Sequence, residues 1–173
     1  QHPELVLQHD DRIVLTGDNG TGKSTLLAAL LPRITLEAHE RIVILQELDR
    51  VALGRLKAEL QALPGRDRGR LLAVIHQLGS EPERILASPA FSPGEARKIM
   101  LALGLLRTPS LIIMDEPTNH MDLPSVRCLE EALRNFAGAL LLVTHDARFA
   151  EALTTKRWRI AREEEGEMAL RVE

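Results

Sequence analysis

The sequence has few aromatic residues and almost no cysteine. Its 173 residues include one Trp, three Phe and no Tyr, and none of these aromatics precedes Phe91. The single cysteine, Cys128, excludes an internal disulfide framework and suits a reducing, cytoplasmic environment. A small residue on a helix is a simpler interpretation of Cys128 than a reactive thiol. The sequence begins at Gln1 instead of Met, so we expect its natural beginning to be absent.

Long apolar runs and a strong net charge are also missing. The longest apolar runs, such as residues 139–143, are far too short to span a bilayer, and no signal peptide is visible. A net charge of −3 gives no general attraction to nucleic acid or membrane surfaces. Hydrophobic residues make up 45% and charged residues 27%, so this length and composition predict one globular domain with its own core.

The strongest motif lies in residues 17–25. It reads Gly17, Asp18, Asn19, Gly20, Thr21, Gly22, Lys23, Ser24 and Thr25, and fits the phosphate-loop pattern G-x-x-x-x-G-K-[ST]. Glycines let the backbone fold tightly, so that successive N–H groups and a helix N-terminus can surround nucleotide phosphates. Lys23 is expected to reach the β- and γ-phosphates, and the Ser24 hydroxyl to bind Mg²⁺. The plain alternative is a glycine-rich turn that only begins a helix.

Apolar strand-like segments alternate with helix-like segments along the chain. Strands are predicted at residues 12–16, 41–45, 111–114 and 139–144, with a terminal hairpin at 157–173 that turns at 163–166. Helices are predicted after the phosphate loop and at 48–63, 71–78, 92–106 and 124–135, with a short one after Asp146. Residues 80–91 are expected to be irregular. Arg66, Arg68 and Arg70 read as a basic loop, which is either a solvated surface or a contact for phosphate or RNA.

This alternation predicts an α/β fold with a mostly parallel sheet that has helices on both faces. In such sheets the ligand lies beyond the carboxyl ends of the strands. Gly17, Gln46, Asp115 and His145 each follow the end of a predicted strand. We therefore expect these residues to converge at one edge of the sheet.

Three polar residues at that edge have a chemistry that suits a nucleotide. Asp115 can hold Mg²⁺ together with Ser24, and Glu116 can orient or deprotonate a water molecule. His145 can donate a hydrogen bond to a phosphate, although a buried and satisfied histidine is the alternative.

Residues 92–95 have the marks of a helix start. Ser92 can cap the helix, Pro93 suits its first position, and Glu95 completes a capping box. A capped helix N-terminus with a small Gly94 is also a site for an anion. Asp122 has the same two interpretations, as a simple helix cap or as a functional residue.

The order of these motifs resembles the nucleotide-binding domain of ATP-binding cassette (ABC) proteins over almost the whole chain. Residues 17–25 resemble the Walker A loop, and residues 111–116 resemble Walker B with its catalytic glutamate. Residues 92–96 resemble a variant of the LSGGQ signature, which contributes Ser92 and Gly94. Single-residue matches are Gln46 for the Q-loop, Asp122 for the D-loop and His145 for the switch histidine. Residues 115–122 read DEPTNHMD, close to the DEPTNHLD of the ABC-F subfamily.

The chain also departs from the family pattern. Pro93 replaces the first signature glycine, and Glu95 replaces the usual glutamine, as is common in ABC-F proteins. No aromatic residue that could stack on adenine precedes the loop, and the stretch from Lys23 to Gln46 is shorter than the family norm. We therefore expect further natural residues to be absent. The tail around Trp158 resembles the end of a second cassette.

The resemblance implies a P-loop NTPase fold with a small helical subdomain, at about residues 47–108, and a Mg²⁺-dependent ATPase activity. The implied cofactors are ATP and Mg²⁺, with Ser24, Asp115 and Gln46 at the metal and Glu116 acting on water. Gln46 and His145 sense the γ-phosphate. Cassettes of this family pair head to tail, so that ATP is sandwiched between Walker A of one and the signature of the other.

The resemblance leaves the partner of the complete protein open. An ABC-F protein implies a ribosome, whereas a transporter cassette would drive a membrane permease, against which residues 118–122 argue. A nucleotide-binding module without catalysis is a second alternative, and Glu116 argues against it. A chromosome-maintenance or DNA-repair ATPase would need long coiled-coil insertions that this sequence does not contain.

Overall fold

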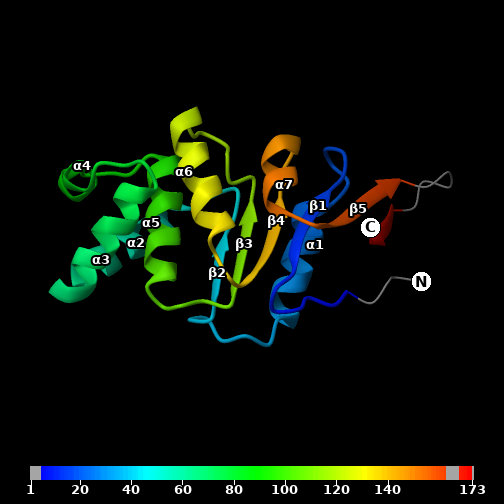
Figure 1. Cartoon of the computed structure of the whole chain (residues 1–173), viewed down its shortest axis with the longest axis horizontal. Helices are drawn as coiled ribbons and strands as arrows, with labels where there is room; N and C mark the ends of the chain where they lie inside the picture. The colour runs from blue at the N-terminus through cyan, green and yellow to red at the C-terminus, as the bar shows by residue number, and fades with distance from the viewer. Residues whose placement is uncertain (1–4, 163–167, 173) are drawn as a thin grey trace.

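The computed structural model describes residues 5–162 and 168–172. Its centre is a six-stranded sheet in the order β2-β3-β4-β1-β5-β6 (Figure 1). The strands are β1 (Arg12–Thr16), β2 (Arg41–Ile44), β3 (Leu111–Asp115), β4 (Ala139–Val143), β5 (Lys156–Arg162) and β6 (Met168–Val172). Neighbouring strands pair in parallel except β5 and β6, which are antiparallel. The predicted mostly parallel sheet and both strands of the terminal hairpin are confirmed, and the predicted turn at 163–166 lies outside the described residues.

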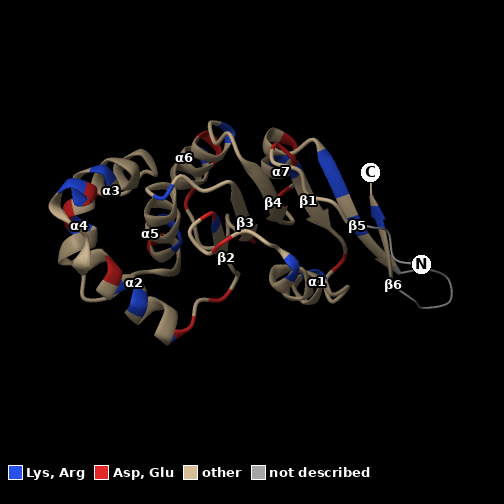
Figure 2. Ribbon diagram, turned by 90° about the horizontal axis from the view of Figure 1, so that it is seen from below, with Lys and Arg blue, Asp and Glu red and all other residues tan. Residues whose placement is uncertain are grey.

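The apolar strands supply both faces of the sheet. In β3, Leu111 and Ile113 join one buried cluster, whereas Ile112 and Met114 join another, because successive side chains of a strand point to opposite faces. Figure 2 shows α1 on one side of the sheet and α6 and α7 on the other. These helices are α1 (Lys23–Leu30), followed by the 3-10 turn η1 (Leu31–Arg33), α6 (Leu123–Arg134) and α7 (Ala147–Leu153). The prediction of helices on both faces is confirmed.

Four helices lie between β2 and β3, at the end of the molecule away from the termini (Figure 1). They are α2 (Arg50–Ala62), α3 (Gly65–Gln77), α4 (Pro82–Ala87) and α5 (Pro93–Leu105). Their apolar side chains extend the cluster that also contains Ile42 and Ile112 of the sheet. Their division from the sheet as a separate subdomain stays a prediction.

The predicted basic loop is wrong, because its three arginines lie in the first turns of α3. The carbonyl of Pro64 accepts the N–H groups of Asp67 and Arg68, at 3.0 and 2.9 Å, and so starts the helix two turns before its apolar residues. Leu71 and Ile75 then bury the stripe that anchors it. The arginines are the solvated beginning of an amphipathic helix.

The predicted irregular segment at 80–91 is also partly wrong, since α4 occupies its centre. Pro82 stands in the first turn of that helix, where its missing N–H has no partner to lose. Ile85 anchors the helix in the core, at 2% exposed. None of the helices in the described ranges has the length and apolar character needed to cross a membrane.

Candidate functional site

The loop between β1 and α1 depends on its glycines. Gly22 is the N-cap of α1 and has a φ of 89°, a left-handed conformation that side chains other than glycine rarely adopt. A Cβ atom at Gly17 would lie 2.7 Å from the carbonyl oxygen of Ile160 and 2.7 Å from Thr21 Oγ1. The backbone can therefore make this tight turn, with the N-terminus of α1 behind it, only with glycine at these positions.

Lys23 lies against the same loop. Its ammonium donates hydrogen bonds to the carbonyl oxygens of Gly17, at 2.8 Å, and Asp18, at 3.0 Å. The residue is only 8% exposed. A phosphate in the loop would therefore have to take over hydrogen bonds that Lys23 now makes to the loop itself.

A pocket of about 580 Å³ opens at the carboxyl ends of the strands, and we call it the loop pocket. It is lined by Asn19, Gly20, Gly22, Lys23, Ser24, Thr25, Gln46, Asp115, Glu116, Asn119 and His145. The convergence of Gln46, Asp115 and His145 on the phosphate loop is therefore found. Asn119 was not among the predicted site residues, although it lies within the eight-residue run at 115–122.

Ser24 and Asp115 form the polar centre of the loop pocket. The Ser24 hydroxyl donates a hydrogen bond to Asp115 Oδ2 at 3.1 Å. Burial raises the pKa of Asp115, and the Ser24 hydrogen bond and the charges of Lys23 and Arg97 oppose that rise. Mg²⁺ prefers oxygen ligands, usually a few from the protein completed by water and phosphate. The hydroxyl and carboxylate, with the Gln46 amide in the same pocket, fit that ion.

Glu116 presents a carboxylate next to His145. Its Oε1 lies 3.1 Å from His145 Nε2, yet within the described part of the chain no group is oriented to donate a hydrogen bond to this oxygen. Glu116 is 6% exposed and has a φ of 49°, held by a hydrogen bond from its N–H to the Val143 carbonyl at 2.7 Å. A buried carboxylate oxygen to which no protein group donates can accept a hydrogen bond from a water molecule.

The exposure of His145 decides between the two interpretations of this residue. Its side chain is 53% exposed, so it is not a buried, satisfied histidine. Its backbone N–H donates a hydrogen bond to Glu116 Oε2 at 3.4 Å. The imidazole therefore lies at the mouth of the loop pocket, where a ligand can reach it.

Ser92, Gly94 and Asp122 lie in a different hollow of about 380 Å³, which we call the Ser92 pocket. The segment at 116–122 runs from one pocket to the other, since Asn119 lines the loop pocket and His120 lines the Ser92 pocket. The structure therefore divides the predicted site residues between two surfaces. Within one chain, Ser92 and Gly94 do not line the pocket that contains the phosphate loop.

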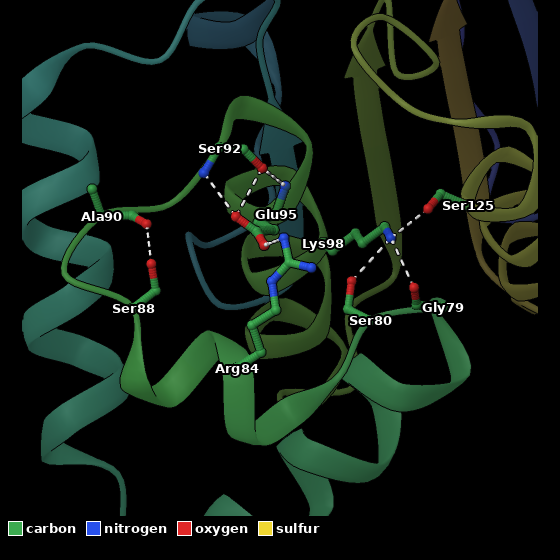
Figure 3. Close-up of polar contacts among 9 residues, drawn as sticks. All are labelled: Gly79, Ser80, Arg84, Ser88, Ala90, Ser92, Glu95, Lys98 and Ser125. Atoms are coloured by element: carbon green, nitrogen blue, oxygen red, sulfur yellow. Dashed lines mark hydrogen bonds and ion pairs between the residues drawn. The ribbon is translucent and has the colours of Figure 1, made fainter.

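The predicted capping box at the start of α5 is confirmed (Figure 3). The Ser92 N–H donates to Glu95 Oε2 at 2.9 Å, and the Glu95 N–H donates to Ser92 Oγ at 3.2 Å. Arg84 Nη2 lies 3.5 Å from Glu95 Oε1. Partial burial alone would raise the pKa of Glu95, but the Ser92 hydrogen bonds and the charges of Arg84 and Lys98 outweigh it and lower that pKa.

Lys98 places a buried positive charge at the Ser92 pocket, which the sequence analysis did not predict. Its ammonium donates to Ser125 Oγ at 2.7 Å, Ser80 Oγ at 3.0 Å and the Gly79 carbonyl at 3.4 Å (Figure 3). Burial lowers the pKa of Lys98, and the nearby charge of Asp122 partly opposes this. Asp122 caps α6 by accepting the Ser125 N–H at 3.0 Å, so it is a helix cap that also lines the pocket.

We compared the chain with protein-family models, curated proteins and solved structures. A family model described as "ABC transporter" matches residues 1–119. The ribosome protection protein VmlR of Bacillus subtilis (strain 168) is 32% identical over 171 residues, which cover 91% of this chain and 30% of VmlR. ATP-binding cassette sub-family F member 3 of Homo sapiens is 32% identical over 163 residues, which cover 86% of this chain and 23% of that protein. The chain thus spans less than a third of the length of these curated relatives.

A solved structure resembles the fold over nearly the whole chain. It is the dimeric, post-hydrolysis state of the ATP-binding cassette MJ0796 bound to ADP and Pi. The TM-score is 0.69 at 20% identity, and the match covers 98% of this chain and 87% of that one. At this identity the likeness shows a common fold.

Proposed function

This chain belongs to the ABC transporter family, and from that membership we propose that it is an ATP-binding and ATP-hydrolysing cassette of the ABC-F type. The observation that carries the proposal is the contact of Ser24 Oγ with Asp115 Oδ2 in one pocket with Glu116. A hydroxyl and a carboxylate beside a phosphate loop suit the metal of a nucleoside triphosphate, and a second carboxylate suits the attacking water.

Different residues of the loop pocket bind the phosphates and the metal. The backbone N–H groups around Gly20 and Gly22 and the Lys23 ammonium hold the phosphates, while Ser24, Asp115 and Gln46 hold the metal. Bound Mg²⁺ neutralises phosphate charge. Asn19, Thr21 and Thr25 complete the loop.

Hydrolysis then needs a base and a phosphate-facing donor. Glu116 Oε1 accepts a proton from a water molecule while the oxygen of that water bonds to the γ-phosphorus. The bond from the γ-phosphorus to the β–γ bridging oxygen breaks, which leaves ADP and phosphate. The His145 backbone N–H orients that carboxylate by donating to Glu116 Oε2, and the exposed imidazole, with Nε2 3.1 Å from Glu116 Oε1, meets the γ-phosphate. A general base of this kind contributes roughly 10²–10⁴-fold to a rate.

We propose that a second cassette completes the site. Ser92 is exposed at the N-terminus of α5, and Lys98 adds positive charge to its pocket, so this surface suits the γ-phosphate of ATP held by another loop pocket. The separation of Ser92 from the loop pocket within one chain supports this arrangement. The dimeric form of MJ0796 is consistent with it.

For the full-length protein we propose a cytoplasmic location and a ribosome as partner, supported by the residues at 115–122 and by the relative named as a ribosome protection protein. A membrane permease is the second candidate, and the description of the family model favours it.

One experiment tests both the activity and the partner. The full-length protein is assayed for phosphate release from Mg-ATP and is then sedimented with ribosomes in the presence of a non-hydrolysable ATP analogue. Phosphate release with ribosome co-sedimentation supports the proposal. Absence of phosphate release with and without ribosomes contradicts the ATPase, and association with a permease alone supports the transporter candidate.

A further inference from the structure

Arg97, on α5, is a buried cation that none of the predictions used. It is 2% exposed, and its guanidinium bonds to two backbone carbonyls. Nη1 donates to the Asn119 carbonyl oxygen at 2.8 Å, and Nη2 donates to the Gln46 carbonyl oxygen at 2.6 Å. A planar guanidinium can serve two acceptors at once, which a lysine ammonium cannot do with the same geometry.

Burying the positive charge of Arg97 costs free energy. Burial lowers the pKa of Arg97, and the charge of Asp115 partly opposes this effect. Both hydrogen-bond acceptors are neutral, and among the described residues Arg97 Nε has no partner. Buried charges of this kind can often be replaced by apolar side chains without loss of stability. The two carbonyls that Arg97 holds are therefore the feature that needs explanation.

These carbonyls belong to two walls of the loop pocket. Gln46 follows β2 and Asn119 follows β3, and both line the loop pocket, whereas Arg97 lies behind it. Helix α5 also lies close to the 116–122 segment at Gly94, since a Cβ atom at Gly94 would lie 3.0 Å from the His120 carbonyl oxygen. Helix α5, which begins beside Ser92, is thus hydrogen-bonded through Arg97 to the segment that separates the pockets and approaches it closely at Gly94.

We propose that Arg97 is a positioning residue that couples Gln46 and Asn119 in the loop pocket to Ser92 at the start of α5. A ligand that moves Gln46 then moves the Ser92 surface, which faces a second cassette. The inference rests on the proposed function, since it assigns a role to Arg97 within that ATP site.

The test compares Arg97→Lys with Arg12→Lys in the full-length protein. Arg12 is the matched control because its guanidinium also serves two backbone carbonyls, those of Leu133 and Phe136. It stands at the first residue of β1, at the opposite end of the strands from the loop pocket. Both variants keep the positive charge and lose the double hydrogen bond, although Arg12 is less buried than Arg97.

Calorimetry measures ATP affinity with and without Mg²⁺, and phosphate release measures kcat and KM at varied Mg²⁺. For Arg97→Lys we expect metal-free ATP affinity close to that of the parent. We expect the Mg²⁺ concentration for half-maximal binding to rise, and kcat to fall, each by about tenfold, the scale of one hydrogen bond to a charged group. Arg12→Lys should leave both quantities within about twofold of the parent.

A double variant shows whether Arg97 acts through Gln46. Arg97→Lys added to Gln46→Ala should not shift the Mg²⁺ dependence beyond that of Gln46→Ala alone, whereas independent effects would multiply. Multiplied shifts, or equal shifts from Arg12→Lys, overturn the inference while ATP hydrolysis by the parent leaves the proposed function standing. A parent that fails to bind Mg-ATP overturns the proposed function itself.

Hydrogen exchange in the parent keeps the inference testable if Arg97→Lys does not fold. Mg-ADP, which lacks the γ-phosphate that would reach a second cassette, should slow amide exchange at residues 46–48 and at 94–97 together. Slowing at 46–48 with no change at 94–97 overturns the coupling.

Discussion

Ser24 Oγ lies 3.1 Å from Asp115 Oδ2, which joins the start of α1 to the end of β3 across 91 positions of sequence. The contact exists because β1 and β3 both pair in parallel with β4, so their carboxyl ends lie at the same edge of the sheet. Burial makes the charge of Asp115 costly, and a bound cation would offset that cost.

Asp115→Asn should separate stability from metal binding. Because the pKa of Asp115 is raised in the folded protein, its ionised form destabilises the fold at neutral pH, and that penalty disappears as the pH falls below the raised pKa. The nucleotide-free variant should therefore unfold at the same temperature as the parent or higher, but gain no stability from Mg-ATP. Thermal unfolding with and without Mg-ATP measures this. Asp49→Asn, at the cap of α2, is the control, and full Mg-ATP stabilisation of Asp115→Asn would contradict the metal assignment.

Lys23→Ala should remove most ATP affinity and leave the fold intact. The variant also loses hydrogen bonds to the carbonyls of Gly17 and Asp18, which are worth about 1 kcal/mol each in stability. Lys57→Ala is the control because Lys57 also donates to a backbone carbonyl, that of Pro89 at 2.9 Å, and lines neither the loop pocket nor the Ser92 pocket. Calorimetry with ATP measures the difference. Unchanged ATP binding by a folded Lys23→Ala protein would refute the phosphate-loop assignment.

Glu116→Gln should stop hydrolysis and preserve binding. The amide keeps the shape of the side chain but cannot accept the proton of water, so phosphate release should fall by roughly 10²–10⁴-fold. Two cassettes should then stay assembled around uncleaved ATP, which size-exclusion chromatography with Mg-ATP detects.

Glu151→Gln, an exposed substitution on α7, is the control for the Glu116 experiment. Parental turnover by Glu116→Gln would eliminate Glu116 as the base. Inactivity without a tighter ATP-dependent assembly would instead contradict the sandwich of cassettes and leave the base assignment unaffected.

Glu95→Gln should alter the pH dependence of stability. The pKa of Glu95 lies below its ordinary value of 4.5 in the folded protein, so the ionised side chain contributes stability above that value and loses it as the pH falls through the folded pKa. Glutamine retains the capping-box geometry but loses the charge interactions, which are worth about 0.5 kcal/mol.

Urea unfolding at pH 7 and at acidic pH measures the Glu95 effect, with exposed Glu83→Gln on α4 as the control. The Glu95→Gln protein should be less stable than the control at pH 7 and closer to it in acid. A constant difference at all pH values would show that the charge of Glu95 contributes nothing.

The sequence by itself determined the features that depend on neighbours along the chain. The glycines of the phosphate loop, the capping box of Ser92 and Glu95, and the apolar strands were all predicted, because backbone conformation and burial pattern are local properties. The edge at which Gln46, Asp115 and His145 meet also followed, since parallel strands share a direction.

Only the tertiary structure decided which side chains are buried among polar groups. Arg97 and Lys98 were not singled out from the sequence, yet they are only 2% and 5% exposed because the 116–122 segment and α6 pack against α5. The helical extent of 65–70 and 82–87 likewise depended on the anchoring of Leu71 and Ile85 in a shared core. Such contacts join residues distant in sequence, and helix propensity is too weak to predict them without the packing that stabilises each helix.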